Sequence, residues 1–222
     1  MSGLNRVMFY IVHNFFKIIA FFVFHFLYRL KQEGTENIPK KGGFIAMPNH
    51  ASYWDPPLTG VTHKRYFHFM ARSTLFIPVW GMFLRWMGAF PVKRGKIDRD
   101  SWSNLYKLVR DGWPVVFFPE GTRTEDGEIQ KGKPGTGMII YNARVPVVPV
   151  YLHGTREAWP KGQKTPKFFK KLHVIYGKPI HFDEYYSKEA GREVYEAITE
   201  KVMSEIKAMK DRFLKAEQAE KR

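Results

Sequence analysis

The chain has 222 residues, a formal net charge of +15 and no cysteine. Without cysteine, disulfide bonds, thiolate nucleophiles and cysteine metal sites are excluded. The positive charge predicts attraction to anionic partners, namely nucleic acid, anionic lipid or an acidic carrier protein. Aromatic residues make up 16% of the chain, and such residues fill cores but also collect at membrane interfaces.

The N-terminal stretch from Val7 to Tyr28 is apolar and long enough to cross a bilayer. Lys17 lies near its middle, however, and a central lysine costs about 2.5–3.5 kcal/mol on insertion scales. No small-residue cleavage site follows the stretch, which argues against a signal peptide. We therefore expect a bent or two-piece helical element, divided around Lys17, that lies in one leaflet. A spanning helix and a buried core helix are the alternatives.

From residue 34 onward, short apolar runs alternate with amphipathic stretches. We expect strands at residues 43–49, 65–71, 88–94, 113–119 and 145–154, and a strand pair or one bent strand at 172–182. We expect helices at 101–110 and 133–143, and a long amphipathic helix from residue 188. This alternation predicts an α/β fold with a central mixed sheet flanked by helices. The expected parts are an N-terminal membrane-associated helical segment (1–33), the α/β domain (34–187) and a C-terminal amphipathic helix packed on it (188–222).

The stretch from Ser73 to Phe90 is almost entirely apolar and aromatic. A core helix is the ordinary explanation for such a composition. The alternative is a second surface that dips into the membrane beside the functional site.

The segment MPNHASYWDPP, residues 47–57, places His50 and Asp55 five residues apart between prolines. An aspartate can orient a histidine by accepting a hydrogen bond from one ring nitrogen, which leaves the other nitrogen to take a proton. The prolines disfavour a continuous helix, so a turn can bring the two side chains together. Alternatively, Asp55 caps a helix that begins at Pro56, and His50 has no catalytic task. A histidine and an aspartate without a third ligand nearby give little support for a metal site.

The segment FPEGTRT, residues 118–124, follows a strongly β-prone run, and α/β sheets bind ligands at such strand ends. Gly121 permits a tight turn, and Arg123 offers a planar fork suited to a phosphate or carboxylate. Glu120 can accept a hydrogen bond from a substrate hydroxyl or pair with an arginine. Arg94 ends another expected strand, so the two arginines can converge on one anion. The alternative is a charged turn with a surface Glu–Arg pair.

Taken together, four sequence blocks resemble the glycerolipid acyltransferase family, specifically lysophosphatidic acid acyltransferases of the bacterial type. The blocks, in chain order, are NHASYWD (49–55), GAFPVKRG (88–95), FPEGTRT (118–124) and VPVVPVYL (145–152). Each block alone is common, but four in this order are specific. The resemblance covers residues 34–179.

The resemblance implies transfer of a fatty acyl group from acyl-CoA or acyl-ACP to the free hydroxyl of 1-acyl-sn-glycerol-3-phosphate, giving phosphatidic acid without a cofactor. It implies that His50 is the general base and that Asp55 is its orienting partner. The residues that it implies for the phosphorylated acceptor are Arg94, Glu120, Gly121, Thr122 and Arg123, with Lys133 from a block (GKPG) that departs from the F-K-x-G of many members.

A thiolate leaves more readily than an alkoxide, so we expect direct attack in a ternary complex, with Ser52 as a turn hydroxyl and not a nucleophile. The expected location is the cytoplasmic face of the cell membrane, monotopic or peripheral, on anionic phospholipid. We expect no nucleic-acid partner, because the basic residues are scattered and no binding module is visible. The alternatives are another acceptor, such as glycerol phosphate or a different lysophospholipid, and a basic membrane-binding protein without activity.

Overall fold

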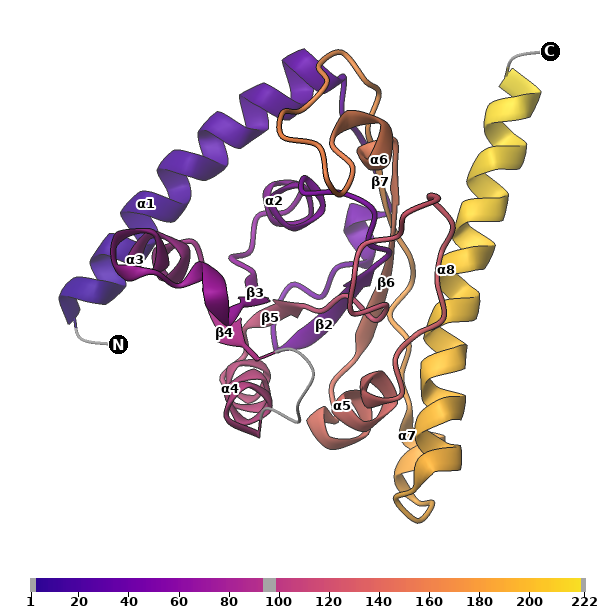
Figure 1. Cartoon of the computed structure of the whole chain (residues 1–222). Helices are drawn as coiled ribbons and strands as arrows, with labels where there is room; N and C mark the ends of the chain where they lie inside the picture. The colour runs from indigo at the N-terminus through magenta and orange to yellow at the C-terminus, as the bar shows by residue number, and fades with distance from the viewer. Residues whose placement is uncertain (1–2, 94–98, 221–222) are drawn as a thin grey trace.

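A computed structural model describes residues 3–93 and 99–220. Within these residues, seven strands form one sheet in the order β1-β7-β6-β2-β5-β3-β4 (Figure 1). The strands are β1 (Lys31–Glu33), β2 (Phe44–Pro48), β3 (His68–Arg72), β4 (Ala89–Val92), β5 (Pro114–Val116), β6 (Val147–His153) and β7 (His173–Tyr176). Only β6 and β7 pair antiparallel among these strands, and the other neighbours are parallel. The expected central mixed sheet is confirmed.

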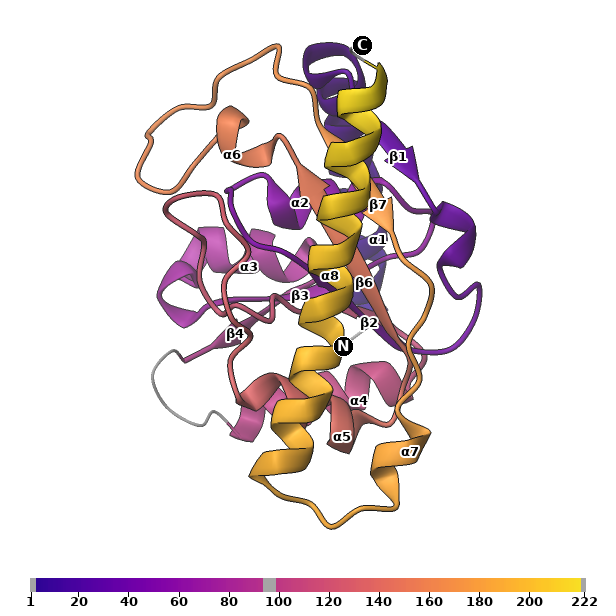
Figure 2. The same cartoon turned by 90° about the vertical axis from the view of Figure 1, so that its right-hand side faces the viewer.

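The helices of the described residues are α1 (Gly3–Phe22), α2 (Asp55–Val61), α3 (Pro78–Trp86), α4 (Arg99–Arg110), α5 (Gly135–Ala143), α6 (Thr155–Ala158), α7 (Asp183–Tyr186) and α8 (Arg192–Glu220). A π-helical turn, η1 (Val23–Leu27), continues α1, and two short 3-10 turns occur at η2 (Thr35–Asn37) and η3 (Ser73–Leu75). Helices therefore flank the sheet on both sides (Figures 1 and 2).

Two apolar cores lie on the two faces of the sheet. Successive side chains of a strand point to opposite faces, and the buried strand β2 shows this division. Phe44 and Ala46 pack in the core that includes η1 and α2. Ile45 and Met47 pack in the core that includes α4, α5 and α8. The central strand is thus covered on both faces, as is usual for parallel strands.

The N-terminal helix differs from the expected two-piece element. α1 runs without a break from Gly3 to Phe22, and the irregular turn comes later, at Val23–Leu27. Lys17 does not interrupt the helix, since lysine has a high helix propensity, and its ammonium group donates a hydrogen bond to the His63 carbonyl oxygen. The stretch Val7–Leu27 is long and apolar enough to cross a membrane, and few of its residues are buried. By length and composition, this segment is suited to contact with a membrane.

The apolar stretch at Ser73–Phe90 is not a core helix. It forms η3, then α3, then the start of β4, and Gly81 is the buried residue of α3. Val79 is 77% exposed and Trp80 is 49% exposed. α3 packs on α1, where the Phe16 and Phe83 rings meet edge to face with centroids 4.8 Å apart. The ordinary explanation is therefore wrong, and an apolar surface remains.

The expected strand pair or bent strand at residues 172–182 is shorter in the structure. β7 covers His173–Tyr176, and beyond it the pairing is a single bridge between Val147 and Ile180. Pro179 in this segment lacks the N–H that a continuing ladder needs. The sheet also includes β1, which lies inside the N-terminal segment that we expected to be separate. The three-part division of the chain stays a prediction.

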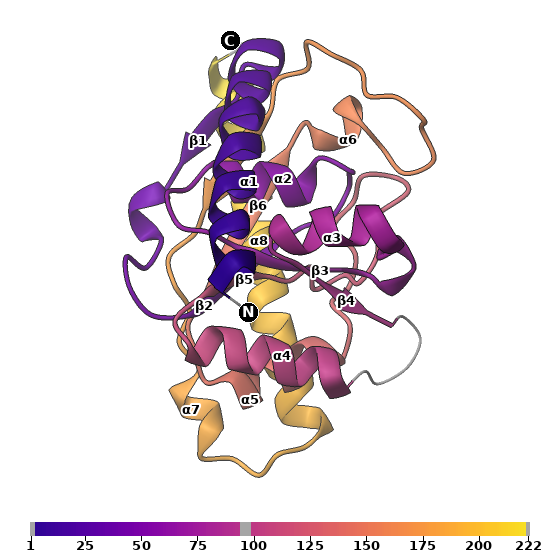
Figure 3. The ribbon, with the colours of Figure 1, turned by 90° about the vertical axis from the view of Figure 1, so that its left-hand side faces the viewer.

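The long C-terminal helix α8 lies across the face of the sheet opposite to α1 (Figures 1 and 3). It packs on α5 and β6. Its buried side chains are Ile198, Thr199, Val202, Met203, Ile206 and Met209. Their spacing of three and four residues is that of one helix face.

Candidate active site

The fold brings the two sequence motifs together because their strands are neighbours. β2 and β5 pair in parallel, and parallel strands end at the same edge of a sheet. His50 follows β2 by two residues, and Glu120 lies a short way beyond β5. The carboxyl edge of a parallel sheet is where α/β folds bind their ligands.

The Asp55 carboxylate holds the His50 ring. His50 Nδ1 lies 2.8 Å from Asp55 Oδ2, and the same oxygen accepts backbone N–H bonds from Ala51 and Ser52, both at 2.7 Å. The Asp55 side chain is fully buried, whereas that of His50 is 12% exposed. Asp55 is the first residue of α2, and its carboxylate bonds to residues that precede the helix. The alternative in which Asp55 serves as a helix cap is therefore not what the structure contains.

The backbone of His50 is fixed from both sides by the second motif. Its N–H donates to Glu120 Oε1 at 2.7 Å, and its carbonyl accepts from the Thr124 N–H at 2.8 Å. The second carboxylate oxygen of Glu120 accepts the Gln130 N–H at 3.0 Å. Glu120 thus joins two loops, and this geometry favours a positioning role over the expected contact with the acceptor.

Glu120 is fully buried, and this burial raises its pKa to about 7. The two backbone N–H bonds oppose the shift, because they stabilise the charged form, while the nearby Asp55 and Asp126 add to it. A carboxylate that accepts two N–H bonds is a strong link only when it is ionised. The link between the motifs is therefore strongest above neutral pH.

Aromatic rings stack on His50 and on Arg123. The His50 ring stacks on Phe118 with centroids 3.9 Å apart. The Arg123 guanidinium lies 3.6 Å from the centroid of the Tyr53 ring, and Tyr53 in turn contacts Trp159. Stacking on an aromatic face limits the rotation of an arginine while leaving its N–H edge free for an anion.

Gly121 and Lys133 lie side by side. The Gly121 backbone has a φ of 69°, and a Cβ added there would lie 3.2 Å from Cγ of Lys133. The Lys133 N–H donates to the Pro119 carbonyl at 2.8 Å, which holds the lysine beside the turn. Thr122, between Gly121 and Arg123, is half-buried. Arg94 lies outside the described residues, so its predicted place in the site stays a prediction.

Ser52 is part of the turn that shapes the loop. Its hydroxyl donates to the Trp159 carbonyl at 2.7 Å and accepts the Trp54 N–H at 3.0 Å. The side chain is fully buried. A hydroxyl that is bonded in both directions suits the expected turn role and not that of a nucleophile.

Sequence reasoning assigned no role to several residues that shape the site. The Asn49 side chain donates to the Leu152 carbonyl at 3.1 Å and accepts the Leu152 N–H at 2.7 Å, which ties the loop to β6. Thr124, Phe118 and Tyr53 are the other residues of this kind. All of these except Leu152 lie inside the blocks 49–55 and 118–124. Their nearness in sequence to His50 and Arg123 was the feature that could have identified them.

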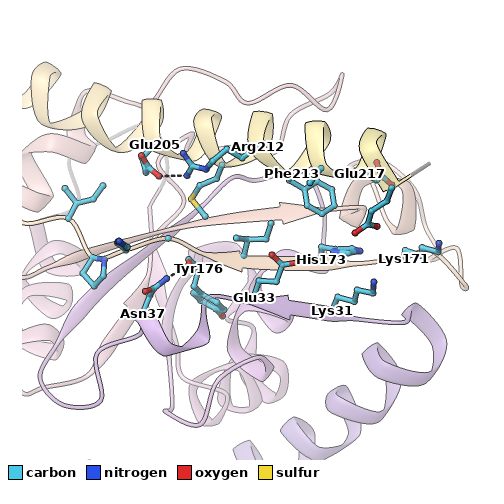
Figure 4. A pocket seen from close by; sticks show the side chains of 18 of the residues that line it. Lys31, Glu33, Asn37, Lys171, His173, Tyr176, Glu205, Arg212, Phe213 and Glu217 are labelled. Carbon is cyan, nitrogen blue, oxygen red and sulfur yellow. Dashed lines mark hydrogen bonds and ion pairs between the residues drawn. The ribbon is translucent and has the colours of Figure 1, made fainter. Parts of the chain in front are cut away.

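A large cavity of the described residues lies away from this site. It is an open groove of about 1140 Å³ between the C-terminal half of α8 and the β1–β7 edge of the sheet. Figure 4 shows Arg212 and Phe213 of α8 on one side, with His173 of β7 and Lys31 and Glu33 of β1 on the other. None of the site residues above lines this groove. Across residues 3–93 and 99–220, no cluster of three metal-ligating side chains occurs.

Comparisons with known proteins give consistent matches. The family model described as Acyltransferase matches residues 29–153. A 1-acyl-sn-glycerol-3-phosphate acyltransferase of Bacillus subtilis is 31% identical over 190 residues, which cover 83% of this chain and 89% of that protein. The chloroplastic enzyme LPAT1 of Arabidopsis thaliana is 32% identical over 174 residues, covering 76% of this chain and 49% of that protein. The chain thus spans about half the length of the plant relatives that it matches.

A solved structure has the same fold over nearly the whole chain. The crystal structure of the 1-acyl-sn-glycerophosphate (LPA) acyltransferase PlsC from Thermotoga maritima superposes with a TM-score of 0.71 at 26% identity. The match covers 95% of this chain and 84% of that protein.

Proposed function

Because this chain belongs to the Acyltransferase family, we propose that it transfers a fatty acyl group from a thioester to the free hydroxyl of 1-acyl-sn-glycerol-3-phosphate, giving phosphatidic acid. The hydrogen bond between His50 and Asp55 at the carboxyl end of β2 is the observation that carries the proposal. The names of the bacterial and plant relatives support this acceptor.

In this reaction His50 is the general base. Its Nδ1 is bonded to Asp55, so Nε2 takes the proton of the acceptor hydroxyl as the hydroxyl oxygen attacks the thioester carbonyl carbon. The carbon–sulfur bond then breaks, and the thiolate takes the proton from His50. Asp55 fixes the ring tautomer and stabilises the imidazolium that forms. A positioned base of this kind contributes about 10²–10⁴-fold to the rate.

The acceptor phosphate binds at the turn after β5. Arg123 supplies a guanidinium held on Tyr53, and Lys133 beside Gly121 adds a second cation. Arg94 and Thr122 complete the proposed phosphate site. Glu120 acts on His50 through the backbone bond described above. The arrangement leaves the proton transfer and the anion binding to different residues of adjacent loops.

The enzyme works at a membrane, on its cytoplasmic face and without crossing it. The polar residues near the middle of α1 bond to the domain: Lys17 to the His63 carbonyl, and Asn14 to the Tyr66 hydroxyl at 2.9 Å. The opposite side of α1 exposes large apolar side chains, such as Ile18 at 58%. A helix held along the domain in this way suits a position within one leaflet.

The test is an acyl-transfer assay with the full chain in vesicles, crossing acyl-CoA and acyl carrier protein donors with three acceptors. These are lysophosphatidic acid, glycerol 3-phosphate and a lysophosphatidylcholine. We expect transfer to lysophosphatidic acid, and a loss of about 10²–10⁴-fold in His50→Ala. His181→Ala, at an exposed histidine outside the site, is the matched control and keeps full activity.

Transfer to one of the other acceptors alone would replace the proposed substrate while keeping the chemistry. Full activity in His50→Ala would remove the mechanism. A burst of thiol release in the absence of any acceptor would point to an acyl-enzyme and to Ser52 as the nucleophile.

A further inference from the structure

Large apolar side chains are exposed in a small number of places. Apart from Tyr53, the exposed ones in the described residues fall in three segments: α1 with η1, residues 75–82, and the pair Phe168 and Phe169. The first two segments pack on each other through α1 and α3. The pair at 168–169 is separate in sequence and lies in the loop between α6 and β7.

This loop, residues 161–171, has a composition unlike the rest of the surface. Its sequence, KGQKTPKFFKK, contains five lysines and no acidic residue. Phe168 is 51% exposed and Phe169 is 74% exposed. Lys161 pairs with Glu125, whereas Lys164, Lys167 and Lys170 are exposed lysines of the same loop. Lysines around exposed aromatic residues are the combination that binds an anionic membrane surface.

Backbone hydrogen bonds hold the loop against the C-terminal end of the N-terminal helix. The Phe169 N–H donates to the Leu27 carbonyl at 2.9 Å, and the Leu172 N–H donates to the Tyr28 carbonyl at 3.1 Å. Figures 1 and 3 show the loop beside this end of the helix. Phe169 has a φ of 62°, a left-handed conformation that is uncommon for a bulky residue. The backbone hydrogen bond of Phe169 therefore holds this residue where its side chain is exposed.

The loop continues the exposed apolar surface of the helix. Phe26 in η1 is 73% exposed, and it directly precedes Leu27, whose carbonyl accepts the loop bond. The same end of the helix leads to the active site, because the Trp54 indole N–H donates to the Tyr28 hydroxyl at 3.1 Å and Trp54 precedes Asp55. The loop is thus connected, through Tyr28 and Trp54, to the residue before Asp55.

We propose that the loop 161–171 is a further membrane contact, which inserts Phe168 and Phe169 among anionic headgroups and so sets the depth of the segment 49–55 relative to the membrane. This inference rests on the proposed function at a membrane. An acidic protein could also bind lysines, but two exposed phenylalanines next to an apolar helix surface favour a lipid partner.

The absence of cysteine permits a single-site label at each position of interest. An environment-sensitive fluorophore is attached to Phe169→Cys, to Phe26→Cys as the helix reference and to Ser204→Cys on α8 as the water-exposed reference. Each labelled full-length protein is mixed with vesicles of phosphatidylcholine and phosphatidylglycerol that carry a lipid-linked quencher. We expect the label at 169 to be quenched like the label at 26, while the label at 204 is unaffected.

A label at 169 that behaves like the one at 204, with the label at 26 quenched, overturns this inference and leaves the membrane location standing. If neither 26 nor 169 is quenched, the proposed membrane location fails and the inference fails with it. A label at 169 that responds to acyl carrier protein but not to vesicles assigns the loop to a protein partner and also overturns the inference.

Binding of unlabelled variants gives a second, independent measurement. Phe168→Ser with Phe169→Ser should lower the vesicle partition coefficient about tenfold, since two large apolar side chains no longer leave water. Each lysine-to-glutamine change at 164, 167 or 170 should lower it about fivefold on anionic vesicles, and not on pure phosphatidylcholine. Glu200→Gln, at an exposed position of α8, is the control. Unchanged partitioning in the double serine variant, with its thermal unfolding intact, contradicts the inference.

Discussion

The two long helices α1 and α8 lie on opposite sides of the molecule (Figure 1), and their amphipathic faces are reversed. α8 buries apolar residues, such as Val202 and Ile206, and exposes charged ones. α1 exposes apolar residues, such as Ile11 and Ile18, and directs Lys17 toward the domain. One side of the molecule therefore suits water and the other suits lipid.

The difference shows that a polar residue in the middle of an apolar helix need not face lipid or water, because it can face the protein itself. The apolar length of α1 satisfies the requirement for a spanning helix. Its central lysine becomes acceptable because a carbonyl of the domain accepts its hydrogen bond, and not because the helix breaks. A docked helix of this kind can lie in a leaflet with its domain attached.

The largest expected effect comes from making one substitution on both helices. Ile206→Ala in α8 removes a side chain with no exposed surface and should lower the free energy of unfolding by about 2–5 kcal/mol. Ile18→Ala in α1 should change it by less than about 0.5 kcal/mol and instead lower vesicle partitioning about fivefold. Urea denaturation in detergent and vesicle flotation measure the two quantities. Equal losses of stability would mean that α1 is a buried helix.

The next largest effect of a substitution is expected for Lys17→Met, which tests the polar contact between α1 and the domain. The change leaves the His63 carbonyl without its donor, which should lower the free energy of unfolding by about 1–3 kcal/mol. A spanning α1 predicts the reverse, because a central lysine opposes insertion. Denaturant titration of the variant, with Lys64→Met at an exposed neighbouring position as control, separates the two possibilities.

Acid should weaken the contact between α1 and the domain before it affects α8. His68 stacks on Phe9 of α1, and burial lowers its pKa to about 4, against the hydrogen bond to Gly88. The unfolded state therefore binds a proton that the folded state does not, and stability falls as the pH drops from about 6.5 to about 4. We expect a loss of roughly 3 kcal/mol for this residue by pH 4, since each unit of pKa difference corresponds to about 1.4 kcal/mol.

Hydrogen exchange measured between pH 7 and pH 4 tests this expectation, with the rates corrected for the intrinsic effect of pH. Amides of α1 should lose protection in this range, while those around Ile206 in α8 keep theirs. His63, which also faces Lys17 and Arg65, has a pKa lowered to about 4 by burial and adds to the same trend. Protection of α1 that does not change with pH would contradict the expectation.

The smallest effect is expected on the charged face of α8. Arg212 pairs with Glu205 at 2.7 Å, and both side chains are exposed. Surface ion pairs of this kind contribute about 0–1 kcal/mol. Arg212→Ala should therefore change thermal stability very little and leave vesicle binding unchanged. A large loss of vesicle binding would show that α8 also contacts lipid.

The site could be predicted from sequence in its residue types more than in its contacts. The blocks containing His50 and Glu120 were recognisable, and both follow strands that end at the same edge of the sheet. The bond from the His50 N–H to Glu120, and the stacking of Arg123 on Tyr53, depend on how two distant loops meet. Residue spacing carries no information about such contacts.

The sequence by itself determined the α/β pattern, the order of the motifs and the existence of two amphipathic or apolar helices, because periodicity and strand propensity are local properties. Only the tertiary structure decided which face of α1 is buried, that Lys17 has a partner at His63, and that most of the large apolar side chains of residues 75–82 stay exposed. The physical reason is that burial and hydrogen bonding across long sequence distances depend on the neighbours that the fold supplies.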